Sequence, residues 1–287
     1  MSDFYVDTLN RLLRKDLLRR DMKVLVVCAG RYDQEVLQQC GFTNVTMSNL
    51  DTRVRGDEFA PYGWSFQDAE ELDFDDGQFD VAIAHSGLHH CRSPHRALLE
   101  MYRVARQGAI VFEPSDNVVT RFGVRLGLGQ EYELAAVAGN DCRFGGQKNT
   151  PIPNYVYRWT EREVEKTVSS YAPFGAHEFL YFYKLRMPWY RSRMMTHRLL
   201  DAAYLLLSPL ARCLTWVFPR WSNNFAFMVL KPGCQDDLHP WLTAEGGTIA
   251  LNAAWVRRRY GAAPDAARQE TQTTLQETDT TIVSTRP

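Results

Sequence analysis

The chain has 287 residues, of which 45% are hydrophobic and 23% are charged, a composition typical of a globular protein with one substantial core and an appended subdomain. Its formal net charge of -1 provides no overall electrostatic attraction for nucleic acid, so we expect no nucleic-acid partner. The six cysteines never form a CxxC pair, which argues against a zinc site and a disulfide framework and fits a reducing cytoplasm.

The first predicted element is an amphipathic helix within residues 1–22. Charged residues occur throughout this segment and no small-residue cleavage site follows it, so it does not resemble a signal peptide. We expect the helix to pack on the edge of the sheet that follows. Its apolar side is formed by leucines at roughly helical spacing: Leu9, Leu12, Leu13, Leu17 and Leu18.

A continuous aliphatic run, Lys23–Cys28, predicts the first buried strand of a domain that extends over residues 23–232. A short loop through Ala29 and Gly30 leads into a helix from Asp33. Glycine lets the backbone approach a ligand closely, and the N-terminus of a helix offers unpaired N–H groups to a carboxylate. This loop is therefore one wall of a predicted ligand site.

A second strand, Asn44–Ser48, follows a helix that ends at Gly41, and Asp51 stands just beyond this strand. Ligands of an open α/β sheet bind beyond the carboxyl ends of the strands, where a carboxylate can accept hydrogen bonds from ribose hydroxyls. Asp51 comes about twenty residues after Gly30, the spacing of a βαβ nucleotide-binding unit. The alternative is a surface aspartate that caps a turn. A nicotinamide-dependent oxidoreductase is disfavoured, because the first loop has one glycine where that fingerprint needs three.

The segment Phe79–Pro114 can be divided into strand, loop, helix and strand. Val81–Ala84 and Ala109–Phe112 are apolar runs of strand length, and the helix between them begins at Ser93–Pro94 and is expected to end at Gly108. The loop after the first of these strands lies where a ligand would bind. It holds the polar side chains His85, Ser86, His89 and His90.

This block resembles class I S-adenosylmethionine-dependent methyltransferases of the type 11 group. The features it shares with them are the pair His89–His90, the helix that starts with Pro94, and Glu113–Pro114 at the end of the next strand. The resemblance covers residues 23–114 well. It implies an α/β fold, a Rossmann-like doubly wound sheet that is mostly parallel with an antiparallel last strand, and an enzyme whose cofactor is S-adenosylmethionine.

The resemblance also implies cofactor contacts. Gly30 would lie under the methionine end, Asp51 on the ribose, and Asp68 near the adenine amine. Because an N-terminal helix often closes over the cofactor in such enzymes, a lid is the alternative position for residues 1–22. The implied cofactor site comprises Cys28, Ala29, Gly30, Asp51, Asp68, Ala69, His85 and Ser86.

Methyl transfer is an in-line displacement at an activated carbon, so positioning dominates and no metal is required. A hydroxyl acceptor needs a base, and histidine suits that task near neutral pH. His89 and His90 are the candidate catalytic residues, and the alternative is a pair that only caps backbone. We predict O-methylation of a small-molecule, glycan or lipid-linked acceptor, with a catalytically degenerate scaffold as the alternative.

Residues 115–155 contain many glycines and only a short predicted helix around 132–137, so we expect a lid. The next helix is predicted to begin at Thr160, with Glu163 three residues later completing a capping box. Its inward side should carry valines. The strand Glu178–Leu185 follows.

Residues 184–220 combine seven lysines or arginines with an apolar run over 199–218. Asp201, Pro209 and Arg212 interrupt this run, so we do not expect a membrane span. A helical insertion is predicted instead, either a hairpin that buries its leucines or a membrane-surface element. The second alternative adds peripheral membrane association to an otherwise cytoplasmic protein and favours a lipid-carried acceptor.

The last strand of the domain is predicted at Phe225–Leu230, and it is the strand that should be antiparallel. Residues 233–261 contain enough apolar and aromatic residues to pack as a C-terminal appendage. Residues 262–287 lack periodicity and are rich in alanine, glutamine and threonine, so we expect a disordered tail.

Overall fold

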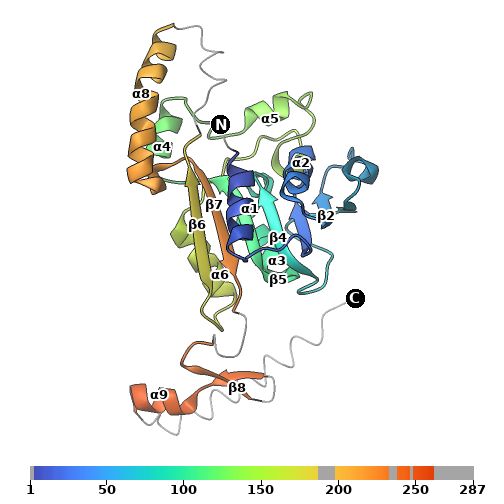
Figure 1. The fold of residues 1–287 in the computed structure, drawn as a ribbon, viewed down its shortest axis with the longest axis vertical. Coiled ribbons are helices and arrows are strands. Elements are labelled where there is room, and N and C mark those ends of the chain that lie inside the picture. The colour runs from blue at the N-terminus through green and yellow to red at the C-terminus, as the bar shows by residue number, and fades with distance from the viewer. Residues whose placement is uncertain (1–2, 187–197, 233–237, 246–247, 262–287) are drawn as a thin grey trace. The chain divides into compact units, whose positions relative to one another are not determined.

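The computed structural model describes residues 3–186, 198–232, 238–245 and 248–261. The chain divides into two compact units (Figure 1). The first consists of residues 1–173 and 177–231, and the second of residues 174–176 and 232–287. The predicted disordered tail, 262–287, lies outside the described residues.

The first unit is built on a seven-stranded sheet with the order β3-β2-β1-β4-β5-β7-β6. Strand β7 is antiparallel to both of its neighbours, β5 and β6, and the other pairs are parallel. The predicted fold class is therefore confirmed, including the helical insertion before the last strand. The strands are β1 Lys23–Val27, β2 Asn44–Asn49, β3 Gly63–Phe66, β4 Phe79–His85, β5 Ala105–Pro114, β6 Glu178–Lys184 and β7 Asn224–Leu230.

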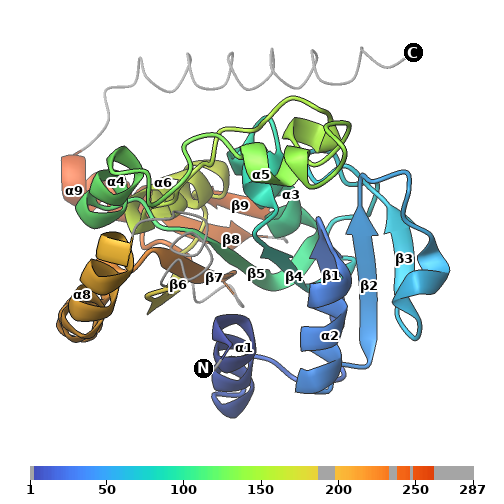
Figure 2. The ribbon, with the colours of Figure 1, turned by 90° about the horizontal axis from the view of Figure 1, so that it is seen from above.

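Helices cover both faces of the sheet, as Figure 2 shows. Along β1, Val24 and Val26 contribute to the core on one face, while Leu25 and Val27 contribute to the core on the other. This alternation explains why the strand is apolar throughout. The helices of this unit are α1 Phe4–Arg14, α2 Arg31–Cys40, α3 Pro94–Val104, α4 Val118–Arg125, α5 Leu134–Ala138, α6 Glu161–Tyr171 and α8 Arg198–Val217.

Helix α1 packs on a face of the sheet, so its predicted position at the edge is wrong. Its buried residues Tyr5, Leu9 and Leu12 belong to the same core cluster as Val24 of β1 and Val81 of β4. Strands β1 and β4 lie in the interior of the sheet. An interior face buries more apolar area than an edge does, and this favours the observed position.

Gly108 does not end α3, which stops at Val104, and strand β5 begins at the next residue. Gly108 lies within this strand at a φ of 153°, where a Cβ atom would stand 1.8 Å from the carbonyl oxygen of Val229 on β7. The glycine therefore permits close approach of two strands. The prediction mistook it for a helix terminator because glycine serves both purposes.

The capping box predicted for α6 is confirmed, because the Thr160 hydroxyl accepts from the Glu163 N–H and the Glu163 carboxylate accepts from the Thr160 N–H. Val164 and Val168 are buried on this helix, as expected. In the second unit, β8 Leu242–Glu245 pairs with β9 Thr248–Leu251, and α9 Ala253–Tyr260 follows.

The described side chains in the last half of α8 do not form a buried hairpin. Leu210, Leu214 and Val217 are exposed, and Trp216 is 85% exposed. Residues 187–197, which would form the start of the predicted hairpin, lie outside the described residues. No helix within the described part of the chain is long and apolar enough to cross a membrane.

Candidate active site

Two cavities lie at the carboxyl ends of the parallel strands, where the sequence predicted a ligand site. We call the smaller one, of about 210 Å³, the acidic cavity, because Asp51 and Asp68 line it. The larger one, of about 600 Å³, is the apolar cavity. Ser86, just beyond β4, lines both, so the two cavities meet there.

The acidic cavity is formed by the ends of β1, β2, β3 and β4 and by the segment 145–149. Asp51 follows β2, and its carboxylate is held by Arg53, whose Nη2 lies 2.6 Å from Oδ2. This hydrogen bond holds the pKa of Asp51 below its usual value. Asp68 follows β3, and its Oδ2 lies 2.6 Å from Nζ of Lys148. Each of these two carboxylates is thus already paired with a cationic side chain of the protein.

Two residues other than glycine adopt a left-handed backbone conformation at this end of the sheet. Cys28 has a φ of 53° and Ser86 a φ of 52°, and both line the acidic cavity. A Cβ on Gly87 would stand 2.3 Å from Cβ of Cys28, so these two strand ends approach each other closely. Left-handed backbone costs such residues about 1–2 kcal/mol each and is concentrated at functional sites.

The N-terminus of α2 differs from the prediction. The helix begins at Arg31 rather than at Asp33, and the Asp33 carboxylate accepts the Gly30 N–H at 2.8 Å. Burial raises the pKa of Asp33 to about 7. The chain itself therefore already satisfies an N–H group that we expected to face a ligand. Ala29 is buried, and neither it nor Gly30 lines the acidic cavity.

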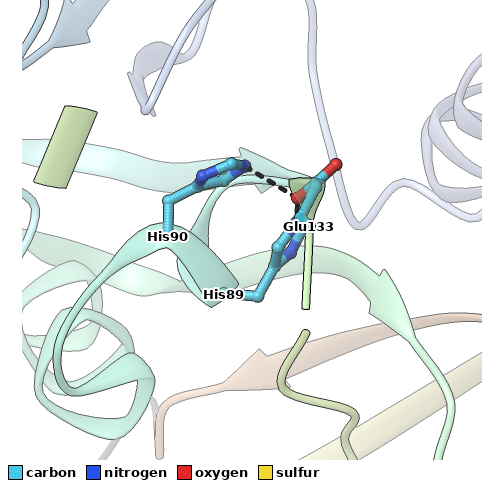
Figure 3. Close-up of side chains that lie close together, drawn as sticks. All are labelled: His89, His90 and Glu133. Atoms are coloured by element: carbon cyan, nitrogen blue, oxygen red, sulfur yellow. Dashed lines mark hydrogen bonds and ion pairs between the residues drawn. The ribbon is translucent and has the colours of Figure 1, made fainter. Parts of the chain in front are cut away.

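The side chains of His89, His90 and Glu133 lie close together (Figure 3), and they line the two cavities near the point where these adjoin. Nδ1 of His89 lies 2.6 Å from Oε2 of Glu113, and Nε2 of His89 lies 3.1 Å from Oε2 of Glu133. Nε2 of His90 lies 3.4 Å from the same Glu133 oxygen. The other oxygen of Glu113 accepts the backbone N–H of Leu88 at 2.8 Å, so the buried carboxylate is fixed at both ends.

The adjacent histidines have opposite pKa shifts. Burial alone would lower the pKa of His89, but the charges and hydrogen bonds of Glu113 and Glu133 outweigh burial and raise it to about 10. Burial, together with the nearby His89, lowers the pKa of His90. Burial would raise the pKa of Glu133, yet its contacts with His89 lower it to about 2. At neutral pH, His89 is therefore an imidazolium and His90 a neutral imidazole.

His85 lies apart from the acidic cavity and lines the apolar one. Its ring stacks on Tyr5, with centroids 4.7 Å apart, and also contacts Tyr32 at 5.2 Å. Burial lowers its pKa to about 4. The residue is therefore a neutral histidine packed between aromatic rings.

The apolar cavity is lined mainly by aliphatic and aromatic side chains, with two arginines among them. Arg158 is half-buried and donates to the carbonyl oxygens of Val156 and Gln130. Burial lowers the pKa of Arg158. Arg186 lines the same cavity. The apolar part of the lining includes Phe4, Phe112, Val119, Val124, Leu128, Val156, Leu185, Trp221 and Phe225.

The structure thus brings together most of the residues that the sequence singled out. The sequence did not single out Arg53, Lys148 or Glu133 for the site. Lys148 and Glu133 lie in the glycine-rich segment 115–155. No local pattern relates either residue to the strand ends, and only the fold brings them there. The predicted residues that line the acidic cavity are Cys28, Asp51, Asp68, Ala69, Ser86 and His90, and those that line the apolar cavity are His85, Ser86 and His89.

Residues 27–112 match a family model described as a methyltransferase domain. The match runs from the end of β1 to β5 and includes Asp51, Asp68 and the histidine pair. The resemblance to class I S-adenosylmethionine-dependent methyltransferases is therefore confirmed. So are the predictions of an enzyme and of S-adenosylmethionine as its cofactor.

No curated protein matches the chain. Among solved structures, magnesium protoporphyrin IX methyltransferase from Synechocystis, with bound SAH, is 13% identical, with 79% of this chain and 82% of that chain covered and a TM-score of 0.45. Phosphoethanolamine N-methyltransferase 2 from Haemonchus contortus, in complex with S-adenosyl-L-methionine, is 14% identical, with 79% and 52% covered and a TM-score of 0.43. At such low identities, these neighbours do not identify a methyl acceptor.

Proposed function

We propose that the protein transfers a methyl group from S-adenosylmethionine in the acidic cavity to an oxygen of an acceptor in the apolar cavity. The observation that carries this proposal is the junction of the two cavities at Ser86, where His89 lines one cavity and His90 the other. In-line transfer requires donor and acceptor to approach each other end to end. Two cavities that adjoin at Ser86 are suited to this arrangement.

The acidic cavity fits the adenosine part of the cofactor chemically. Asp51 would accept hydrogen bonds from the ribose hydroxyls, and Asp68 would lie near the adenine amine. The cavity of about 210 Å³ is smaller than the roughly 300–1,000 Å³ of typical ligand pockets. Residues 145–149 therefore have to move outward for the cofactor to enter, which agrees with the lid predicted for residues 115–155.

His90 is the member of the pair that is suited to accept the proton of an acceptor hydroxyl. A general base must be unprotonated, and the lowered pKa of His90 keeps its imidazole neutral. His89 donates to two carboxylates as an imidazolium, so we assign it a positioning role. In that role it would hold Glu133 against His90.

The lining of the apolar cavity indicates an acceptor with an apolar body and an anionic group. Arg158 and Arg186 would meet a carboxylate or a phosphate, while the aromatic and aliphatic side chains would bury the remainder. Ala211 of α8 also lines this cavity, and the apolar side chains that follow it on the helix are exposed. A lipid-carried acceptor that enters along α8 is therefore the form of acceptor we favour.

Calorimetric titration with S-adenosylmethionine tests the cofactor site. Asp51→Ala should weaken binding at least about tenfold, because a hydrogen bond to a charged acceptor contributes roughly 1.5–3 kcal/mol. Asp73→Ala, which removes an exposed carboxylate further along the chain, is the matched control. Equal affinities of the two variants for S-adenosylmethionine would show that Asp51 does not contribute to cofactor binding. Failure of the unaltered protein to bind would favour the degenerate scaffold.

The acceptor proposal needs a separate measurement. Sedimentation of the full chain with vesicles should recover more protein with anionic than with neutral lipid at low salt, and the difference should fade as salt rises. Equal recovery from the two kinds of vesicle would contradict a lipid-carried acceptor and favour a soluble anionic one.

A further inference from the structure

The cluster at the cavity junction has the composition and spacing of a metal site. His89, His90 and Glu133 each offer one ligand atom, and these three atoms lie within 4.8 Å of one another. The Glu133 oxygen is 3.1 Å from Nε2 of His89 and 3.4 Å from Nε2 of His90. Ligands at about 2.1 Å from a tetrahedral ion are roughly 3.4 Å apart, so small adjustments would suffice to enclose an ion.

The surroundings of His89 are those of a metal-binding histidine. Its Nδ1 is hydrogen-bonded to Glu113, and this orients the ring so that Nε2 lies 3.1 Å from Oε2 of Glu133. Glu113 is itself fixed by the Leu88 N–H. A carboxylate on the far nitrogen of a ligating histidine sets its tautomer and orientation and increases its basicity. Here this outer partner is fully buried.

The charges of the cluster also favour a divalent cation. Glu113 and Glu133 bring two carboxylates into a largely buried place, where their ionisable partners are imidazoles. Among the described residues, neither carboxylate has an ion pair with a lysine or an arginine. Buried charge needs compensation. Without a metal, the imidazolium of His89 supplies part of it; a divalent ion that displaced the His89 proton would balance both carboxylates while both imidazoles are neutral.

We propose that His89, His90 and Glu133 bind a divalent transition-metal ion, with Glu113 as the residue that orients His89. Two imidazoles and one carboxylate suit Zn²⁺, Fe²⁺, Mn²⁺ or Co²⁺. The sequence did not indicate this site, because Glu133 lies 44 residues beyond His89 and no local pattern in the chain pairs the two residues.

An ion in this position would lie between the two cavities and could polarise the oxygen of an acceptor. The Nε2 atom of His90 cannot hold an ion and accept a proton at the same time. Metal binding would therefore replace the role of His90 as a base. The site itself does not depend on cofactor binding, so it can be tested with the metal alone.

The test is a titration of the full chain, stripped of metal by a chelator, with Co²⁺ alone. We expect visible absorption bands that saturate at one ion per chain, and Zn²⁺ should displace the Co²⁺. Glu133→Gln keeps the size of the side chain but removes its charge, and it should weaken binding by about tenfold or more. Glu131→Gln, two residues earlier and exposed, is the matched control and should bind as the unaltered protein does.

His90→Ala provides a second, independent loss of a ligand and should also weaken Co²⁺ binding. Far-UV circular dichroism of each variant shows whether it is folded. If folded Glu133→Gln and His90→Ala both bind Co²⁺ as tightly as Glu131→Gln does, the ion is held elsewhere and the proposal is wrong. If the unaltered protein gives no saturable bands, the proposal is wrong and the four residues form a hydrogen-bonded cluster without a metal.

Discussion

Replacement of Lys148 by methionine is expected to tighten the binding of S-adenosylmethionine. In the structure, Nζ of Lys148 lies 2.6 Å from Oδ2 of Asp68 and 3.4 Å from Glu70. The ammonium is thus paired with Asp68, the carboxylate that we propose contacts the adenine of the cofactor. The cofactor has to displace this ammonium before it can use Asp68. Methionine keeps the length and apolar stem of the side chain but cannot form the ion pair.

The magnitude follows from the exposure of the pair. Lys148 and Asp68 each have 26% of their side chain exposed, so the ion pair lies near the upper end of the surface range, about 1 kcal/mol. If the cofactor no longer has to break this pair, its affinity should rise roughly fivefold. The ligand-free protein should lose a similar free energy of unfolding, about 1 kcal/mol, because the same ion pair stabilises its folded state.

Calorimetry with S-adenosylmethionine and urea unfolding of the ligand-free protein measure the two effects. Lys166→Met, on the exposed side of α6, is the control for the general loss of one positive charge. The opposite sign would refute the reasoning: weaker cofactor binding in Lys148→Met than in Lys166→Met would mean that Lys148 contacts the cofactor instead of competing with it.

Three further predictions concern the cluster and the sheet. His90→Ala should lower the rate of methyl transfer from radiolabelled cofactor by about a hundredfold and leave cofactor affinity nearly unchanged; an unaltered rate would exclude it as the base. Because the pKa of His89 is raised to about 10, its stabilising contribution is complete below its unfolded pKa of about 6.5 and is lost as pH rises through about 10. Urea unfolding should therefore show the difference between the unaltered protein and His89→Gln shrinking over that range; a constant difference would contradict the pairing. Gly108→Ala should destabilise the fold by roughly 3 kcal/mol, because its Cβ would collide with β7; a change below about 1 kcal/mol in thermal unfolding would show that the strands separate easily.

The sequence by itself located six of the seven strands of the sheet, all but β3, and one half of the candidate site. The strands around Lys23–Cys28, Asn44–Ser48 and Val81–Ala84 could be located because buried parallel strands need continuous apolar runs, a local property. Ligand-binding residues follow the carboxyl ends of such strands, so Asp51 and the histidine pair could be placed from chain order, while Asp68 was placed through the family resemblance.

Only the tertiary structure decided what those residues contact. Glu133 reaches His89, and Lys148 reaches Asp68 over a separation of 80 residues, and no local pattern in the chain indicates either contact. The same tertiary environment gives two neighbouring histidines different protonation states at neutral pH. His89 is charged because two carboxylates flank it, and His90 is neutral because burial outweighs the carboxylates near it.

The position of α1 on a sheet face and the role of Gly108 were likewise decided by tertiary packing. An amphipathic pattern states that a helix has an apolar side, but not which surface covers that side. Burial, charge compensation and close approach are properties of neighbours in space, and a local pattern in the chain does not specify those neighbours.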